Sequence, residues 1–260
     1  MTFILASRPR QGLYVTTPER QQRNPLLRPI SIDSPILDEI DIHLDIKRMD
    51  APLLNHDPPV IYRQAPSTEV DDAWQDLVDS RPVPVTREKV LAMGKDPEQA
   101  VQIPPSWGYG EQAYFGRVDV FHQIHCLDAL RREAHFDHYY GKRYPGGFNE
   151  TDEIHRLHLS HCLHLLLQNI MCTANTDVYT HIWTDTVPWA FPDFNIDHRC
   201  KDFSAIQEWQ KEHALDEDAF LNVKRPEEYP FRVMSHKFKE VHNWPFFGPD
   251  DHDDGTGEIA

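Results

Sequence analysis

The motif His-x-x-His-Cys occurs twice in this chain, and it constrains the fold more than any other feature of the sequence. The copies run from His122 to Cys126 and from His158 to Cys162, 36 residues apart, and each continues into a helical apolar pattern. Residues three and four apart share one face of an α-helix, so each copy directs two imidazoles and a thiol to one side. Two such helices facing each other would form a cage for a metal ion.

Helical periodicity and turn residues predict two helices, over about residues 118–136 and 153–173, separated by Gly- and Pro-containing turns. A duplication confined to one helix each indicates a pseudo-twofold helical pair rather than a solenoid, which needs at least three units. Capping residues Ser67 and Thr86 predict short helices after them, and a last helix is expected over about 202–213. Apolar and polar residues alternate over 40–46, which predicts a half-buried strand. The expected fold is therefore mainly α with a small β element, a single domain built round two facing histidine-bearing helices.

Composition places the chain among globular proteins and sets its expected boundaries. With 40% hydrophobic residues in 260, the chain can bury a core, which we expect over residues 31–245, between a flexible N-terminal arm (1–30) and an acidic tail (246–260). A formal charge of −16 argues against nucleic acid as a partner. No apolar run reaches the roughly 18 residues of a membrane span, and the stretch before Ser7 is too short for a secretory signal.

The inner histidines of the two motifs are the predicted metal ligands and catalytic residues: His122, His125, His158 and His161. Imidazole suits copper, zinc and iron, whereas thiolate suits zinc and reduced copper best. Steps of three residues rotate by about 60° around a helix, so His155 and His164 cannot point at the same ion and are expected at the surface or behind the ligands. Asp128 could orient a ligand, and His198, from a separate segment, is the candidate for a further one.

The cysteines leave several alternatives open. Cys126 and Cys162 could bind metal, pair with each other across the helix interface or pack as small apolar residues, and Cys172 could form a disulfide with Cys200. An even number of cysteines, together with a glycosylation acceptor sequence at Asn149, favours an oxidising compartment. A histidine pair on an amphipathic helix is often only a hydrogen-bonded polar patch, but two copies with the same Cys and Leu positions favour the metal site.

These residues resemble the UstYa-like family, fungal proteins from biosynthetic clusters for cyclic peptides and other secondary metabolites, mycotoxins included. The resemblance rests on both histidine motifs, on Met171-Cys172, on His198-Arg-Cys200 and on the segment from Pro66 to Trp74, and covers about residues 60–215. It implies oxidative tailoring, such as hydroxylation, dehydrogenation, oxidative cyclisation or halogenation, with copper as the metal. It also implies a secretory-pathway lumen, whereas the absence of a signal or anchor in this sequence is an argument for the cytoplasm. Where the family usually has Ala-Asp-Thr, this chain has Ala174-Asn-Thr176.

We therefore expect a copper-dependent oxidoreductase that binds one or two copper ions, with zinc or iron as alternatives, and oxidises C–H bonds of a small-molecule secondary metabolite or peptide-derived substrate. The aromatic segment from Tyr179 to Phe194 is expected to pack on the core, or to line the substrate cleft. A non-oxidative acid–base cyclase or isomerase is one alternative function. A non-catalytic accessory metal protein of a biosynthetic cluster is another. Whatever its function, the protein could form a homo-oligomer, or a hetero-oligomer with a related protein.

Overall fold

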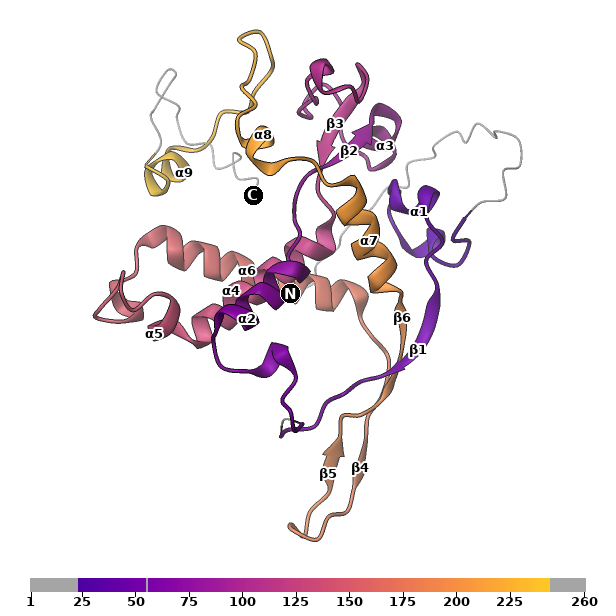
Figure 1. Ribbon diagram of the computed structural model, residues 1–260, viewed down its shortest axis with the longest axis vertical. Coiled ribbons are helices and arrows are strands. Elements are labelled where there is room, and N and C mark those ends of the chain that lie inside the picture. Colours follow the sequence, from indigo (N-terminus) through magenta and orange to yellow (C-terminus); the bar gives the residue numbers. More distant parts are fainter. Residues whose placement is uncertain (1–22, 55, 244–260) are drawn as a thin grey trace, which may run out of the picture.

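The structure is a computed structural model that describes residues 23–54 and 56–243. The predictions for residues 1–22 and for the tail after residue 245 lie outside this range. The elements follow one another along the chain as shown in Figure 1: η1 (Arg28–Ile30), α1 (Ile36–Glu39), β1 (Leu44–Arg48), η2 (Ile61–Arg63), α2 (Thr68–Leu77), β2 (Val83–Thr86), α3 (Arg87–Ala92), η3 (Pro105–Trp107), β3 (Ala113–Gly116), α4 (Asp119–Ala134), α5 (Phe136–Tyr139), η4 (Phe148–Glu150), α6 (Glu153–Thr173), β4 (Thr180–Ile182), β5 (Phe191–Asp193), β6 (Asp197–Lys201), α7 (Phe203–His213), α8 (Glu217–Leu221) and α9 (His236–Val241).

The fold is mixed, which corrects the expectation of a mainly α protein with one small β element. The described residues form three antiparallel sheets of two strands each, β1 with β6, β2 with β3 and β4 with β5. Only β1 overlaps a predicted strand. It is mostly exposed rather than half-buried, because four of its five residues are exposed. The other strands span three to five residues, and two of them contain proline. Such segments are too short for the alternation that identifies a strand in a sequence.

The principal core lies around β2 and β3, away from the histidine motifs. It is formed by buried side chains from α1, β2, α3, β3 and α7: Ile36, Val83, Val85, Val90, Tyr114 and Trp209. The indole of Trp209 also donates a hydrogen bond of 2.8 Å to Glu39 Oε2. Burial of a large aromatic ring with its polar N–H satisfied fixes α7 against the N-terminal part of the chain.

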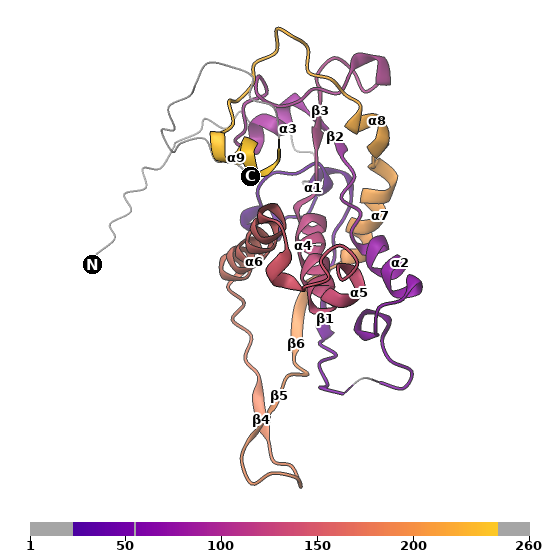
Figure 2. The ribbon, with the colours of Figure 1, turned by 90° about the vertical axis from the view of Figure 1, so that its left-hand side faces the viewer.

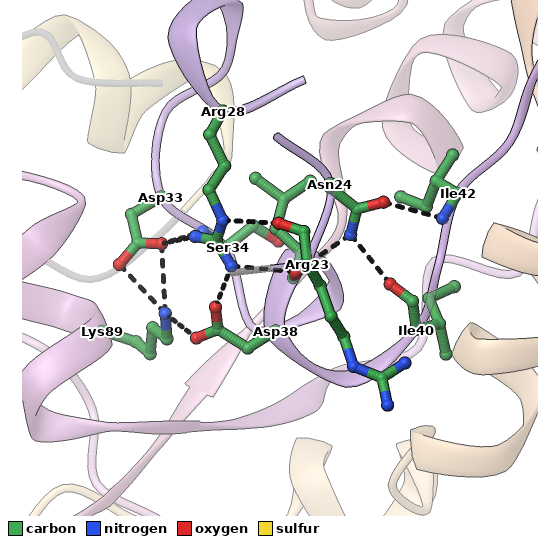
Figure 3. A network of polar contacts seen from close by, with 10 residues as sticks. Arg23, Asn24, Arg28, Asp33, Ser34, Asp38, Ile40, Ile42 and Lys89 are labelled. Atoms are coloured by element: carbon green, nitrogen blue, oxygen red, sulfur yellow. Dashed lines mark hydrogen bonds and ion pairs between the residues drawn. The ribbon is translucent and has the colours of Figure 1, made fainter. Parts of the chain in front are cut away.

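A polar network attaches the first described residues to α3 (Figure 3). The side chain of Asn24 donates to the carbonyls of Leu37 and Ile40 at 2.9 and 2.8 Å and accepts from the Ile42 amide at 2.8 Å. Beside it, Asp38 accepts from both Arg28 and Lys89. Burial of Asn24 together with these bonds makes the segment part of the folded unit.

The aromatic segment after α6 is not packed against the core, contrary to expectation. It contains the β4–β5 hairpin, which projects from the rest of the molecule in both views (Figures 1 and 2). Trp183 and Trp189 are 78% and 63% exposed. Tyr179 makes ring contacts within the segment, with Phe194 at 4.9 Å and His181 at 5.7 Å. The aromatic rings therefore contact one another locally, and the hairpin contributes no residue to the pocket beside the histidines described below.

The predicted helix starts are confirmed. Ser67 accepts a hydrogen bond from the Val70 amide at the start of α2, and Thr86 accepts from Lys89 at the start of α3. The helices α4, α6 and α7 begin and end within two residues of their predicted limits, whereas α8 and α9 were not predicted. Within the described ranges, no helix combines the length and apolar character that crossing a membrane requires.

Candidate metal centre and adjoining pocket

The two motif helices, α4 and α6, pack against each other over much of their length. Asp152 caps the start of α6 by accepting from the His155 amide at 2.9 Å. Phe121, Cys126 and Cys162 are fully buried, whereas many leucines of α6 lie at the surface. The small, buried cysteine side chains allow the helices to approach closely at the point where the two motifs meet.

The four inner histidines form a row across this interface. Ring centroids are 5.9 Å apart for His161 and His122, 6.2 Å for His122 and His125, and 5.7 Å for His125 and His158. Exchanging the two motifs converts the His122–His161 contact into the His158–His125 contact, as pseudo-twofold packing of antiparallel helices requires. The structure therefore brings together the four residues that were predicted as ligands.

The motif cysteines lie next to histidines one turn earlier. Cys126 Sγ is 4.0 Å from His122 Nε2, and Cys162 Sγ is 3.8 Å from His158 Nε2. Burial and a contact with Cys126 raise the pKa of the Cys162 thiol to about 12. All four cysteines are free thiols here, so neither suggested disulfide is present. A metal ion would have to displace the thiol proton in order to bind sulfur.

Three of these side chains have ligand atoms close enough for one ion. Among the described residues, His122, Cys126 and His161 form a group whose ligand atoms all lie within 4.8 Å of one another. A sulfur and a nitrogen bound to one ion from opposite sides would be separated by about 4.3 Å, the sum of typical Zn–S and Zn–N bonds. The observed 4.0 Å between Cys126 Sγ and His122 Nε2 is below this limit. The donor set therefore fits a metal that accepts imidazole and thiolate, such as copper or zinc.

The remaining two inner histidines are held in the neutral form. Burial and the neighbouring His122 lower the pKa of His125, although Asp128 opposes this effect. Partial burial and the neighbouring imidazoles of His125 and His161 lower the pKa of His158. Neutral imidazole is the form that binds a metal or accepts a proton, so both rings are ready for either role near neutral pH.

Asp128 is buried, but arginines rather than histidines occupy its carboxylate. Arg131 Nε and Arg132 Nε each donate to it at 2.7 Å. Arg131 also donates to Asp71 of α2 at 2.8 Å and to Tyr139 at 2.6 Å. The acid acts electrostatically on His125, and its network connects α2 to α4.

The other residues that the sequence analysis singled out make their contacts away from the row of four histidines. His198 Nδ1 is 2.5 Å from Asp177 Oδ2 and 2.9 Å from the Asn175 amide, on β6. Cys172 is exposed at the end of α6, and Cys200 is partly buried on β6. Asn149 is exposed in η4, so its side chain is accessible. His164 is exposed and contacts Gln168.

A pocket of about 340 Å³ adjoins the histidines on the side where α2 lies, and sequence reasoning did not predict it. Its lining comes from α2, α4, α6 and the turn after α5: Gln75, Val78, His125, Asp128, Ala129, Arg132, Glu133, Tyr140, His155, His158 and Leu159. Glu133 and His155 meet here, with His155 Nε2 3.1 Å from Glu133 Oε2. These two residues are 22 positions apart and belong to no motif, so nothing in the sequence identifies the pair.

The family model and similar curated proteins point to the same family. The family model described as mycotoxin biosynthesis protein UstYa matches residues 10–213. The UstYa family oxidase aprY of Aspergillus flavus is 39% identical over 210 residues, which cover 78% of this chain and 62% of that protein. The UstYa family oxidase phomYc of Diaporthe leptostromiformis is 29% identical over 188 residues, 71% of this chain and 70% of that protein.

A more distant relative is named for a different activity. The transacylase cctO of Talaromyces islandicus is 24% identical over 178 residues, which cover 65% of this chain and 57% of that protein. The match to aprY spans less than two thirds of that relative's length. No solved structure matches the chain.

Proposed function

Because the chain belongs to the UstYa family, we propose that it is a copper-dependent oxidative tailoring enzyme of fungal secondary metabolism. The proposed reaction is oxidation of a C–H bond by dioxygen, through hydroxylation, dehydrogenation, oxidative cyclisation or, with halide as a co-substrate, halogenation. The observation that carries the proposal is the group formed by His122, Cys126 and His161, whose ligand atoms lie within 4.8 Å of one another. The oxidase names of aprY and phomYc support a redox role for such a group.

In this proposal the facing pair of α4 and α6 is the catalytic centre. His122, Cys126 and His161 would hold copper, which changes readily between two oxidation states and so supplies the redox chemistry. His125 and His158 lie beside this group and line the pocket. Their neutral imidazoles would either complete the ligand set or accept the proton released from the substrate. Asp128, held by two arginines, would stabilise positive charge developing on His125.

Metal analysis of purified protein tests the ligand assignment. We expect wild type to take up copper, and the double variant His122→Ala/His161→Ala to lose most of that uptake. His164→Ala is the matched control, because it removes an exposed imidazole of α6 whose contact is with Gln168. Equal copper uptake by wild type and the double variant would refute the assignment.

Metabolite analysis tests the reaction type. A fungus that carries the gene with His122→Ala should accumulate a precursor that has one oxygen or halogen atom fewer, or two hydrogen atoms more, than the product made with the wild-type gene. A precursor and product of equal oxidation level would contradict an oxidative role.

A second candidate function is non-oxidative acid–base catalysis by the histidines, which the transacylase name of cctO favours. The lowered pKa of His125 and of His158 would suit proton acceptors. Chelation discriminates the two, because an acid–base enzyme retains its activity when copper is removed whereas a copper oxidase loses it.

A further inference from the structure

The pocket beside His125 and His158 has one wall without a role in metal binding, formed by Glu133, Tyr140 and His155. Its volume of about 340 Å³ lies at the lower end of the range for small-molecule sites, roughly 300–1,000 Å³. It can therefore enclose a ring with a short substituent, or an equivalent part of a larger molecule. Val78, Ala129 and Leu159 are the apolar residues of its lining.

Glu133 carries an acceptor atom without a partner. Its Oε2 pairs with His155, whereas Oε1 is buried and makes no hydrogen bond. A buried carboxylate oxygen without a donor costs about 1–3 kcal/mol or more, so such an atom is expected to find a partner in the working protein. Glu133 is one of the residues that line the pocket, so a ligand there lies next to this carboxylate.

The position of this carboxylate is fixed by its neighbours. The His155 ring lies in a cluster of aromatic rings, with centroid distances of 4.9 Å to Tyr140, 5.6 Å to Tyr144 and 6.3 Å to both Phe136 and Phe148. Rings on several sides restrict rotation of the imidazole, and the imidazole holds Oε2. The carboxylate therefore presents a preorganised acceptor rather than a mobile side chain.

The cationic group of the pocket, in contrast, already has an anionic partner. Arg132 donates to Asp128 at 2.7 Å and lies over the Tyr139 ring at 5.1 Å. Among the described residues that line the pocket, the buried side-chain atom without a hydrogen-bond partner is an acceptor, Glu133 Oε1. An anionic ligand would face both Asp128 and Glu133. The pocket favours a neutral or cationic donor and disfavours a carboxylate.

We propose that this pocket binds the part of the substrate that carries a hydrogen-bond donor, a hydroxyl or an amino group on an apolar ring or chain, through the carboxylate of Glu133. The donor is held at Glu133 while the adjoining carbon lies toward His125 and His158 on the same lining. Glu133 acts here as a specificity residue, and His155 as the residue that positions it. The identity of the bound group as substrate rests on the proposed function, whereas the donor selectivity is a property of the pocket itself.

Small probes test the selectivity without knowledge of the natural substrate. The full chain, both metal-free and loaded with diamagnetic Cu(I), is titrated with benzyl alcohol, benzylamine, benzyl methyl ether and benzoate, and binding is followed by NMR on the histidine ring signals. Benzyl alcohol and benzylamine should bind about tenfold to hundredfold more tightly than the ether, since a hydrogen bond to a charged acceptor is lost. Benzoate should bind most weakly, and the signals of His125 and His158 should shift on binding.

A variant and a control locate the selectivity. Glu133→Gln should reduce benzylamine binding by about tenfold or more and leave copper uptake unchanged, whereas the exposed Glu88→Gln on α3 should change neither. Equal affinity for the alcohol and the ether, or tighter binding of benzoate, would overturn the proposal, and so would unchanged selectivity in Glu133→Gln. If the variant does not fold, the comparison of alcohol with ether on wild type still decides the question. Donor selectivity without any copper uptake would support the pocket and refute the proposed copper function.

Discussion

The two motif cysteines are expected to differ in their contribution to metal binding, although the motifs are alike in sequence. Cys126 belongs to the group with His122 and His161 whose ligand atoms lie within 4.8 Å of one another. Cys162 is equally buried and pairs closely with His158, but it is not part of that group. We therefore predict that Cys126→Ala weakens copper binding strongly and that Cys162→Ala weakens it by less than tenfold.

The size of the effect follows from the number of ligands. Sites with four protein ligands bind zinc with about 10–16 kcal/mol, or about 2.5–4 kcal/mol for each ligand. Losing one of the three ligands of this group should thus weaken the complex by about 10²–10³-fold. At a metal concentration one hundred times the wild-type Kd, metal binding stabilises the fold by about 2.7 kcal/mol, and a hundredfold weaker site retains only about 0.4 kcal/mol.

Competition with a chromophoric Cu(I) chelator measures both affinities, and thermal unfolding with and without metal provides an independent check. Cys126→Ala should lose about 5–9 °C of the shift in Tm that copper produces in wild type. The metal-free Tm values of the two variants serve as the control, since both remove a sulfur that is fully buried. An effect of Cys162→Ala that equals or exceeds that of Cys126→Ala would show that the ion lies elsewhere in the histidine row.

Three further predictions concern stability near the site. Folding lowers the pKa of His125, so below pH about 6.5 the unfolded chain binds a proton at His125 that the folded chain does not, and the free energy of unfolding falls as the pH drops. In urea titrations, His125→Gln should therefore lose less stability than wild type between pH 7 and pH 5. An equal loss would contradict the pKa shift. Arg131→Met should lower the free energy of unfolding by about 2–4 kcal/mol, because it removes the shared partner of Asp71 and Asp128, although each acid keeps one other donor. A loss of less than 1 kcal/mol in urea unfolding would mean that water solvates the network. Asp152→Ala should cost about 1 kcal/mol in the same measurement by removing the cap of α6, whereas Asp152→Ser should recover most of it.

The sequence predicted those parts of the structure that depend on local signals. Helix starts were identified because Ser67 and Thr86 satisfy free amides of the first turn in the expected way. The four inner histidines were selected by the duplicated motif together with helical periodicity, and they do lie in one row. Which of them shares an ion with a cysteine depends on how α4 and α6 pack, and no spacing within one helix contains that information.

Features that depend on contacts distant in sequence were not predicted. The Glu133–His155 pair joins α4 and α6 through two residues that belong to no motif, and Asp128 is held by arginines rather than by a ligand imidazole. The aromatic segment with Trp183 and Trp189 was expected on the core because large rings usually gain from burial. Its two short strands instead pair with each other, so the rings remain outside.

Attachment of the chain at Asn24 has a practical consequence for anyone trimming this protein. A chain that began after residue 30 would lack the Asn24 side-chain amide, which donates to the carbonyls of Leu37 and Ile40, and the buried Leu27. Those carbonyls would then meet water, and so would neighbouring apolar side chains such as Ile40 and Ile42, which pack against the core that contains Trp209. A shortened form intended for crystallisation should therefore begin upstream of residue 23, even though the histidine helices start almost a hundred residues later.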